Sequence, residues 1–405
     1  MKPYRRHAIA TAVSLVPFAI VPSTLASCAS DEDGNDRVHV ESSIAPEGGA
    51  DASLEAAVEV PIDGGCDASD PKCVTTPISC EEASWCPVPT GLSPLHVLAA
   101  VWGSAKDDVW ASGSGGTILH WDGTKWAPTP TSEPVKHTFR AIWGSSGRDV
   151  WIASATDMVF HSNGFANGAA TWVRAPNATG EESTRPIFAA WGTPGGPVRF
   201  GGRGHVVYDF MGDKTLFNQF VARPNGDGGV DWSIERGTAT ITGMWGSSAD
   251  DLWLVGDNSE NVTWQLGWSM RGTRTAKGTF AWVELDTQAS GVLEAVWGSS
   301  ASDVWAVGDK GTIRHIAAGD TQWEIVTSPT KEPLHGLWGS SPNDVWAVGD
   351  SGTILHWDGA TWSPSVAALP VNKKKPHLYG IWGSGPDDVW IVGDGIALHH
   401  TGGTK

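Results

Sequence analysis

Residues 334–362 read LHGLWGSSPNDVWAVGDSGTILHWDGATW and divide into four short segments. LHGLWG, DVWAVG and TILHW are rich in β-branched and aromatic residues, which favour strands, and a fourth segment begins at Trp362. Ser-Ser-Pro-Asn, Asp-Ser-Gly and Asp-Gly-Ala separate the segments, and these residue types are typical of turns. The stretch therefore predicts four short strands joined by tight turns.

The Trp-Gly pair of this stretch marks a repeat. It recurs seven times, 41 to 54 residues apart, at Trp102, Trp143, Trp191, Trp245, Trp297, Trp338 and Trp382. Repeats of about 40–45 residues that each supply four strands are typical of the blades of a β-propeller. No segment of the sequence sustains the 3.6-residue period of an amphipathic helix. We therefore predict an all-β fold with a single seven-bladed β-propeller.

The repeat also predicts how the blades pack. DVWAVG is apolar at consecutive positions, as expected for a strand with both faces buried against neighbouring blades. We expect the seven blades at residues 95–130, 137–176, 187–234, 241–285, 292–327, 334–366 and 377–400.

The last unit lacks the segment that begins with Trp, since the chain stops soon after IALHH. Residues 84–88, SWCPV, resemble residues 362–366, WSPSV, of the preceding unit. We expect residues 84–90 to supply the missing outer strand, so that an N-terminal strand closes the last blade. Closure removes an exposed sheet edge that would invite aggregation.

The units resemble the WG-S-S-x-x-D-V-W-A-V-G…G-T-I-L-H-W-D-G repeats of secreted bacterial propeller proteins. The resemblance covers residues 84–405 and belongs with the Kelch, BNR (Asp-box) and WD-type propellers. It implies the fold only, because such propellers include enzymes, lectins and scaffolds.

Residues repeated in nearly every blade are predicted to serve packing. These are the Trp residues of the repeat and the Asp before Val-Trp, which we expect to accept backbone N–H bonds at a turn. Blade three departs from the pattern, and we place Phe200 where other blades have the second Trp. Residues 209–230 and 269–280 are expected to be inserted loops.

Function is expected where the blades differ. In the first strand of each unit, the residue four before Trp is apolar and the residue two before it is Ala or Gly. The residue three before Trp follows no rule and is Ala99, Arg140, Phe188, Thr242, Glu294, His335 or Tyr379. If this strand is innermost, that column rings the central channel. We predict that a polar ligand binds there, on Arg140, Phe188, Thr242, Glu294, His335 and Tyr379.

The N-terminus has the features of an export signal. Basic residues precede the apolar stretch 8–26, which Pro17 and Pro22 interrupt and which is too short and broken for a permanent membrane span. Leu25-Ala26-Ser27-Cys28 resembles the bacterial lipobox, and the resemblance implies that residues 1–27 are removed and that Cys28 is lipidated. Because no Asp follows Cys28, the same resemblance implies sorting to the outer membrane. Lipid would then be the only membrane attachment.

The segment between Cys28 and the propeller divides into two parts. Residues 28–65 are acidic and lack aromatic residues, so we expect a flexible linker. Residues 66–83 form a Cys-rich lead-in to the propeller at 84–405. Four cysteines in an oxidising compartment predict two disulfides with three possible pairings: Cys66, Cys73, Cys80 and Cys86. A Cys80–Cys86 disulfide would pin the closing strand.

Several kinds of ligand are disfavoured by the composition. Lys and Arg total 27 against 45 Asp and Glu, and the formal charge of -18 argues against nucleic acid. The Cys spacing does not match a zinc site, and residues 31–42 lack the Gly and Glu of a calcium loop. We predict no metal, no cofactor and a monomer.

Three hypotheses for function follow. The first is an envelope-anchored module that binds a protein or a polysaccharide. The second is a glycan-active enzyme, a sialidase-like hydrolase or a lyase, although its arginines and tyrosine would have to come from the scattered Arg140, Arg199, Arg203 and Tyr379. An enzyme should also show paired carboxylates with a perturbed pKa at the channel mouth. The third is a scaffold in an envelope complex, which predicts an apolar patch on the rim.

Overall fold

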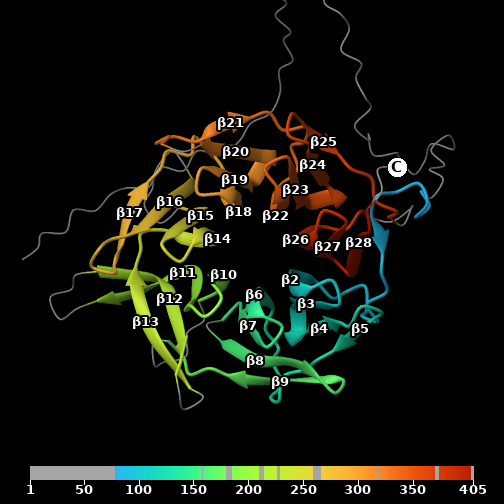
Figure 1. Cartoon of the computed structure of the whole chain (residues 1–405), viewed down its shortest axis with the longest axis horizontal. Coiled ribbons are helices and arrows are strands. Elements are labelled where there is room, and N and C mark those ends of the chain that lie inside the picture. Colours follow the sequence, from blue (N-terminus) through green and yellow to red (C-terminus); the bar gives the residue numbers. More distant parts are fainter. Residues whose placement is uncertain are drawn as a thin grey trace, which may run out of the picture. The chain divides into compact units, whose positions relative to one another are not determined.

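Seven four-stranded antiparallel sheets are arranged in a ring in the computed structural model (Figure 1). The structure describes residues 78–402 except 157, 179–184, 209–213, 226–228, 259–265, 318 and 370–373. None of the described residues belongs to a helix that is long and apolar enough to cross a membrane. The predicted seven-bladed β-propeller is confirmed.

Six blades run outward in chain order, and the last blade takes its outer strand from the N-terminal part of the chain. The first three blades contain the strands β2 (Leu98–Ala105), β3 (Asp108–Gly113), β4 (Ile118–Trp121), β5 (Trp126–Pro128), β6 (Phe139–Ser146), β7 (Asp149–Ser154), β8 (Val159–Ala166), β9 (Ala169–Arg174), β10 (Ile187–Gly192), β11 (Val198–Tyr208), β12 (Lys214–Pro224) and β13 (Val230–Arg236). Blades four and five contain β14 (Thr240–Ser248), β15 (Asp251–Asp257), β16 (Gly267–Arg274), β17 (Phe280–Glu284), β18 (Leu293–Ser300), β19 (Asp303–Gly308), β20 (Thr312–Ala317) and β21 (Glu324–Val326).

Blade six contains β22 (Leu334–Ser341), β23 (Asp344–Gly349), β24 (Ile354–Trp357) and β25 (Trp362–Pro364). The last blade contains β26 (Leu378–Gly385), β27 (Asp388–Gly393), β28 (Ile396–His400) and β1 (Cys86–Pro87). Among the described residues, single 3-10 turns follow the second strand of three blades, at η1 (Ser114–Gly116), η3 (Asp309–Gly311) and η4 (Asp350–Gly352).

The closing strand is β1, which pairs antiparallel with β28 as predicted. Trp85, just before β1, is fully buried and its ring meets Trp346 of blade six edge to face at 5.0 Å. The fourth-strand Trp of blade six makes the same kind of contact with blade five, where Trp362 meets Trp305 at 5.4 Å. Trp85 therefore takes the place of the fourth-strand Trp that the last unit lacks.

The Trp-Gly pairs join the blades to one another. A Cβ on Gly298 would lie 2.7 Å from the Trp245 ring of blade four and 2.8 Å from the Asp303 carbonyl oxygen. Only glycine leaves room for this approach. The same contact runs around the whole ring, in the pairs Trp102–Gly144, Trp143–Gly192, Trp191–Gly246, Trp245–Gly298, Trp297–Gly339, Trp338–Gly383 and Trp382–Gly103.

The repeated Asp residues form side-chain networks. In blade one, Asp108 accepts hydrogen bonds from Trp110 Nε1 (3.1 Å), His120 Nε2 (2.7 Å) and the Ser104 hydroxyl. These partners are side chains, so the predicted role in accepting backbone N–H bonds is wrong. The carboxylate is partly buried between strands whose own backbone N–H groups pair within the sheet.

Other blades repeat the network with small changes. The Ser–Asp bond recurs in blades two, four, five, six and seven, where the Asp residues are Asp149, Asp251, Asp303, Asp344 and Asp388. A third-strand His bonds the Asp in every such blade except blade four, where Arg271 takes its place at 2.7 Å. Asp108, Asp149 and Asp344 are partly buried, which raises their pKa, but the hydrogen bonds outweigh this effect and leave each pKa below its usual value.

Blade three departs from the network more deeply than predicted. Arg199, not Phe200, lies opposite Trp191 and so fills the second Trp position. Arg199 is only 4% exposed, its Nη1 lies 3.0 Å from Glu235 Oε2, and its guanidinium stands 4.7 Å over the Phe280 ring of blade four. The placement of Phe200 was wrong because it matched an aromatic residue, and a shift by one residue turns a strand side chain to the opposite face.

The two predicted insertions were also wrong in part. The third strand of blade three, β12, lies within residues 209–230. The third strand of blade four, β16, covers the first part of residues 269–280. Neither strand carries the Ile-Leu-His-Trp pattern that marks the third strands of blades one and six.

Candidate functional site

The variable column faces the central channel. In each innermost strand the pairing with the second strand skips one residue at this column, for example between Leu98 and Ala100 or between Leu293 and Ala295. The same shift occurs in the other five blades. A bulge of this kind bends the strand and re-aims a side chain. The fold therefore turns the one unconstrained residue of each blade toward the axis.

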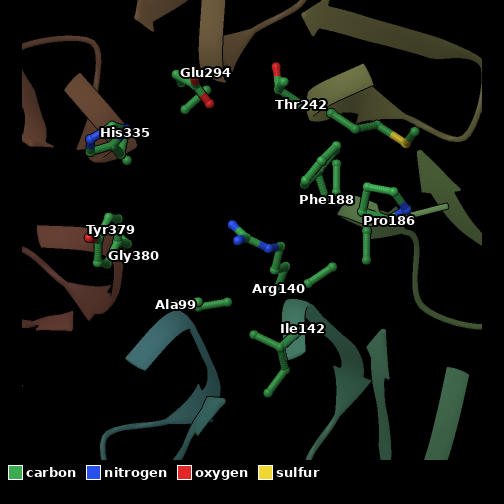
Figure 2. A pocket seen from close by; sticks show the side chains of 18 of the residues that line it. Ala99, Arg140, Ile142, Pro186, Phe188, Thr242, Glu294, His335, Tyr379 and Gly380 are labelled. Carbon is green, nitrogen blue, oxygen red and sulfur yellow. The ribbon is translucent and has the colours of Figure 1, made fainter. Parts of the chain in front are cut away.

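These residues come together in one cavity of about 900 Å³ (Figure 2). The lining includes all seven members of the column, Ala99, Arg140, Phe188, Thr242, Glu294, His335 and Tyr379. The cavity lies at the end of the channel where innermost strands begin and second strands end, because Leu98 pairs with Gly113 there. We call this region the channel mouth. Its volume is in the range of pockets that enclose small ligands, about 300–1,000 Å³.

The residue two before the Trp of each Trp-Gly pair is always Ala or Gly, and its small size lets neighbouring innermost strands pack closely. A Cβ on Gly243 would lie 3.0 Å from Ala295 Cα and 3.1 Å from the Glu294 carbonyl oxygen of the next blade. Neighbouring innermost strands thus approach each other backbone to backbone. Large side chains are therefore excluded at this position. The residue just before it, at the bulge, is the one whose type varies between blades, and we call these seven residues the bulge column.

Arg140 and Phe188 lie side by side on blades two and three. The Arg140 guanidinium stands 5.8 Å from the centre of the Phe188 ring, and the side chain is exposed and points into the middle of the channel (Figure 2). A guanidinium has five donors arranged to match a carboxylate or phosphate. Arg140 can therefore offer a cationic fork to a ligand at the axis.

Glu294 faces the channel from blade five. Burial raises the pKa of Glu294; the positive groups His335 and Arg140 oppose this effect, and Asp309 and Asp257 add to it. The Glu294 carboxyl group therefore holds its proton more readily than an exposed glutamate does.

Blades six and seven place a linked polar cluster at the mouth. Asp350 Oδ1 accepts from His335 Nε2 at 2.8 Å and from His377 Nδ1 at 2.6 Å. Tyr379 has its ring 5.4 Å from that of His335, and burial together with hydrogen-bonded Asp394 raises the pKa of Tyr379 to about 12. His335 and Tyr379 are therefore held in place by carboxylates behind them.

Thr242 contributes to the framework instead. Its hydroxyl lies within hydrogen-bond distance of the Leu293 carbonyl of blade five and of the Val255 carbonyl, 3.2 Å away. Its single donor is therefore satisfied by backbone, and the residue links two blades.

A second set of residues near the mouth was not predicted from the sequence. The residue directly after the second strand's final Gly is acidic in blades four to seven, where it is Asp257, Asp309, Asp350 or Asp394. Blade three has Arg203 there. These residues were passed over as turn residues, although their fixed place after Val-Gly and their change of type in blades one to three distinguished them.

Two of the five cysteines lie in the described part of the chain. Cys80 and Cys86 form a disulfide beside the closing strand, with Cα atoms 5.4 Å apart. Cys28, Cys66 and Cys73 lie outside the described residues, as do residues 1–65. Within the described chain, no group of three or more His, Cys, Asp or Glu side chains is arranged to hold a metal ion.

No family model matches the chain, and no curated protein does. Solved structures match over most of its length. The structure of YCF48 bound to D1 peptide has a TM-score of 0.57 at 17% identity and covers 82% of this chain and 96% of that one. The WD40 propeller of Doa1 has a TM-score of 0.53 at 10% identity, covering 75% and 92%. A streptogramin B lyase has 0.55 at 14%, covering 78% and 97%.

These similarities show that the chain has the β-propeller fold. Their low identities carry no further information on its chemistry, since the same fold includes a peptide-bound protein and a lyase.

Proposed function

We propose that this protein is a binding module whose channel mouth takes a peptide or a polysaccharide segment. The observation that carries the proposal is the bulge column, whose residues change in charge and polarity from blade to blade while their neighbours in the innermost strands stay small or apolar. Its seven residues line a single cavity. That YCF48 is known with a bound peptide supports a peptide as one ligand for this fold.

The proposal can be tested by closing the mouth. Ala99→Trp fills the cavity from blade one, and Val173→Trp, at an exposed site on the outer strand β9, is the matched control. Wild type and both variants are screened by thermal shift against peptide and oligosaccharide libraries. Hits should be lost in Ala99→Trp and kept in Val173→Trp. Hits that survive in Ala99→Trp would place the binding surface elsewhere.

A glycan-active hydrolase or lyase is a second candidate, favoured by Glu294. Burial raises the pKa of Glu294, and a carboxyl group with a raised pKa suits a general acid. The predicted arginine set is incomplete, because Arg199 is buried between blades three and four while Arg140 and Arg203 line the cavity. Turnover of chromogenic glycosides that disappears in Glu294→Gln would support this candidate, and turnover unchanged in that variant would remove it.

A scaffold role rests on the rim. Exposed apolar side chains occur on the outer strands of blades two to five, at Val173, Ile234, Val283 and Ile325. Each belongs to a different blade, and single exposed apolar residues are common on folded proteins. The rim therefore supports a scaffold less strongly than the mouth supports a ligand.

We further propose export and lipid anchoring through Cys28, supported by the lipobox-like Leu25-Ala26-Ser27-Cys28. The acidic linker would hold the propeller away from the membrane. Metabolic labelling with an alkyne fatty acid should mark the wild-type chain and leave Cys28→Ser unlabelled. Equal labelling of both would overturn the proposal.

A further inference from the structure

Two charged side chains of the channel mouth have no polar partner. Within the described residues, the Arg140 guanidinium makes no hydrogen bond or ion pair, and its recorded contact is the Phe188 ring. In the same part of the chain, the Glu294 carboxylate makes no hydrogen bond or ion pair either. The other polar members of the ring are engaged: His335 with Asp350, Tyr379 with Asp394, and Thr242 with backbone.

The Arg140 guanidinium and the Glu294 carboxylate lie on opposite sides of the cavity and differ in sign (Figure 2). Glu294 is partly buried, and its neighbours Asp257 and Asp309 add negative potential on blades four and five. Leaving such a carboxylate without a partner is costly, and a cation would offset that cost. Arg140 on blade two offers its donors to an anion.

We infer that the channel mouth binds a dipolar peptide segment, with an acidic group on Arg140 and a basic group on Glu294. The inference rests on the proposed function and names the ligand of that site. A neutral sugar offers hydroxyl groups but no cation for Glu294, and a uronate offers only an anion for Arg140. A peptide supplies both charges within a few residues, and a cavity of about 900 Å³ fits a short segment.

The test uses a random peptide display library selected on the full chain. Enriched peptides should carry acidic and basic residues together. Their Kd, measured by fluorescence anisotropy, should rise about tenfold or more in Arg140→Gln and in Glu294→Gln, since truncating one partner of a buried charge pair weakens binding by that order. Arg140→Lys, which keeps the charge, should retain part of the affinity.

Matched controls lie on the same two blades outside the mouth. Arg148 is an exposed turn residue of blade two, and Glu324 is an exposed residue of β21 on blade five. Arg148→Gln and Glu324→Gln should bind as wild type does. A library selected again on Arg140→Glu should yield peptides that no longer require an acidic residue. Thermal melts confirm that each variant is folded.

The outcomes separate the inference from the proposed function. Peptides that lose binding in Ala99→Trp but ignore the charge of Arg140 and Glu294 would overturn the dipolar ligand and keep the mouth as a binding site. Enriched peptides of one charge sign would do the same. If no peptide is enriched and a uronate oligosaccharide binds through Arg140, the peptide is replaced by a glycan. Binding that survives Ala99→Trp would overturn both proposals.

Discussion

The two ends of each innermost strand are built on different principles. At one end, the Trp-Gly pair is identical in seven blades and each Trp fills the space left by the glycine of the next blade. At the other end, the bulge column changes with every blade and faces a cavity. Residues that close the ring cannot vary, because every blade needs the same contact. Apart from Thr242, whose hydroxyl links two blades, the residues of this column line the cavity and are available for a ligand.

The largest effect is expected where a repeated position is supplied from far away in the chain. Trp85→Ala empties a fully buried site that closes the ring, and loss of a buried Trp costs about 3–5 kcal/mol. The free energy of unfolding is measured by denaturant titration. Trp85→Phe should recover much of the loss. Wild-type stability in Trp85→Ala would show that the closing strand contributes little.

Gly298→Ala tests the Trp-Gly end directly. The new Cβ would meet the Trp245 ring and a backbone oxygen, so we expect a loss of about 1–3 kcal/mol from overpacking. Gly385→Ala on the last blade is the control, because no atom lies within 4 Å of the added Cβ. Equal thermal melts for the two variants would contradict the role of the glycine.

Asp108→Asn breaks one side-chain network, and we expect a loss of about 1–2 kcal/mol at pH 7. The pKa of Asp108 is lowered in the folded state, so its stabilisation is present above the unfolded pKa of about 4 and is lost as the pH falls below it. The difference from wild type should therefore shrink toward pH 3. Asp107→Asn, one residue earlier and exposed, is the matched control and should be as stable as wild type at pH 7.

Blade three differs from the other blades, because an ion pair between Arg199 and Glu235 takes the place of the Asp network. Glu235→Gln leaves the buried Arg199 without its charge partner, and we expect a loss of about 1 kcal/mol. Replacing Arg199 by Trp should not restore the network, since Pro197 stands where other blades have Asp. Denaturant titration of both variants checks this, and a stabilised Arg199→Trp would contradict it.

The smallest effect on stability is expected at the mouth. The folded-state pKa of Glu294 is raised, so its ionisation destabilises the fold above about pH 4. Glu294→Gln should be more stable than wild type at pH 7, by less than about 1 kcal/mol, and equal to it near pH 4. A Glu294→Gln variant that is destabilised at pH 7 would show that the charge of Glu294 stabilises the fold, because Gln keeps the shape of the side chain and removes only its charge.

Much of the architecture followed from the repeat. The blade count followed from the seven Trp-Gly pairs, and the channel-facing column from its fixed distance to each pair. The closing strand could be predicted because residues 84–88 resemble residues 362–366 of the preceding unit. The His partners of the Asp residues were missed, although His120 and His161 both stand twelve residues after their Asp. Arg199 was misplaced because residue type, and not register, guided the alignment of blade three.

Which residues repeat and which vary could be read from the amino-acid sequence, since strand patterns and turn residues are local properties. The surroundings of the varying residues depend on the folded ring. Arg140, Glu294 and Tyr379 lie far apart in the chain, and closing the ring brings them into one cavity. Likewise Thr242 looked like a ligand-binding residue, but its hydroxyl is satisfied by the backbone of the next blade. Contacts between blades depend on the closed ring, and no local pattern records them.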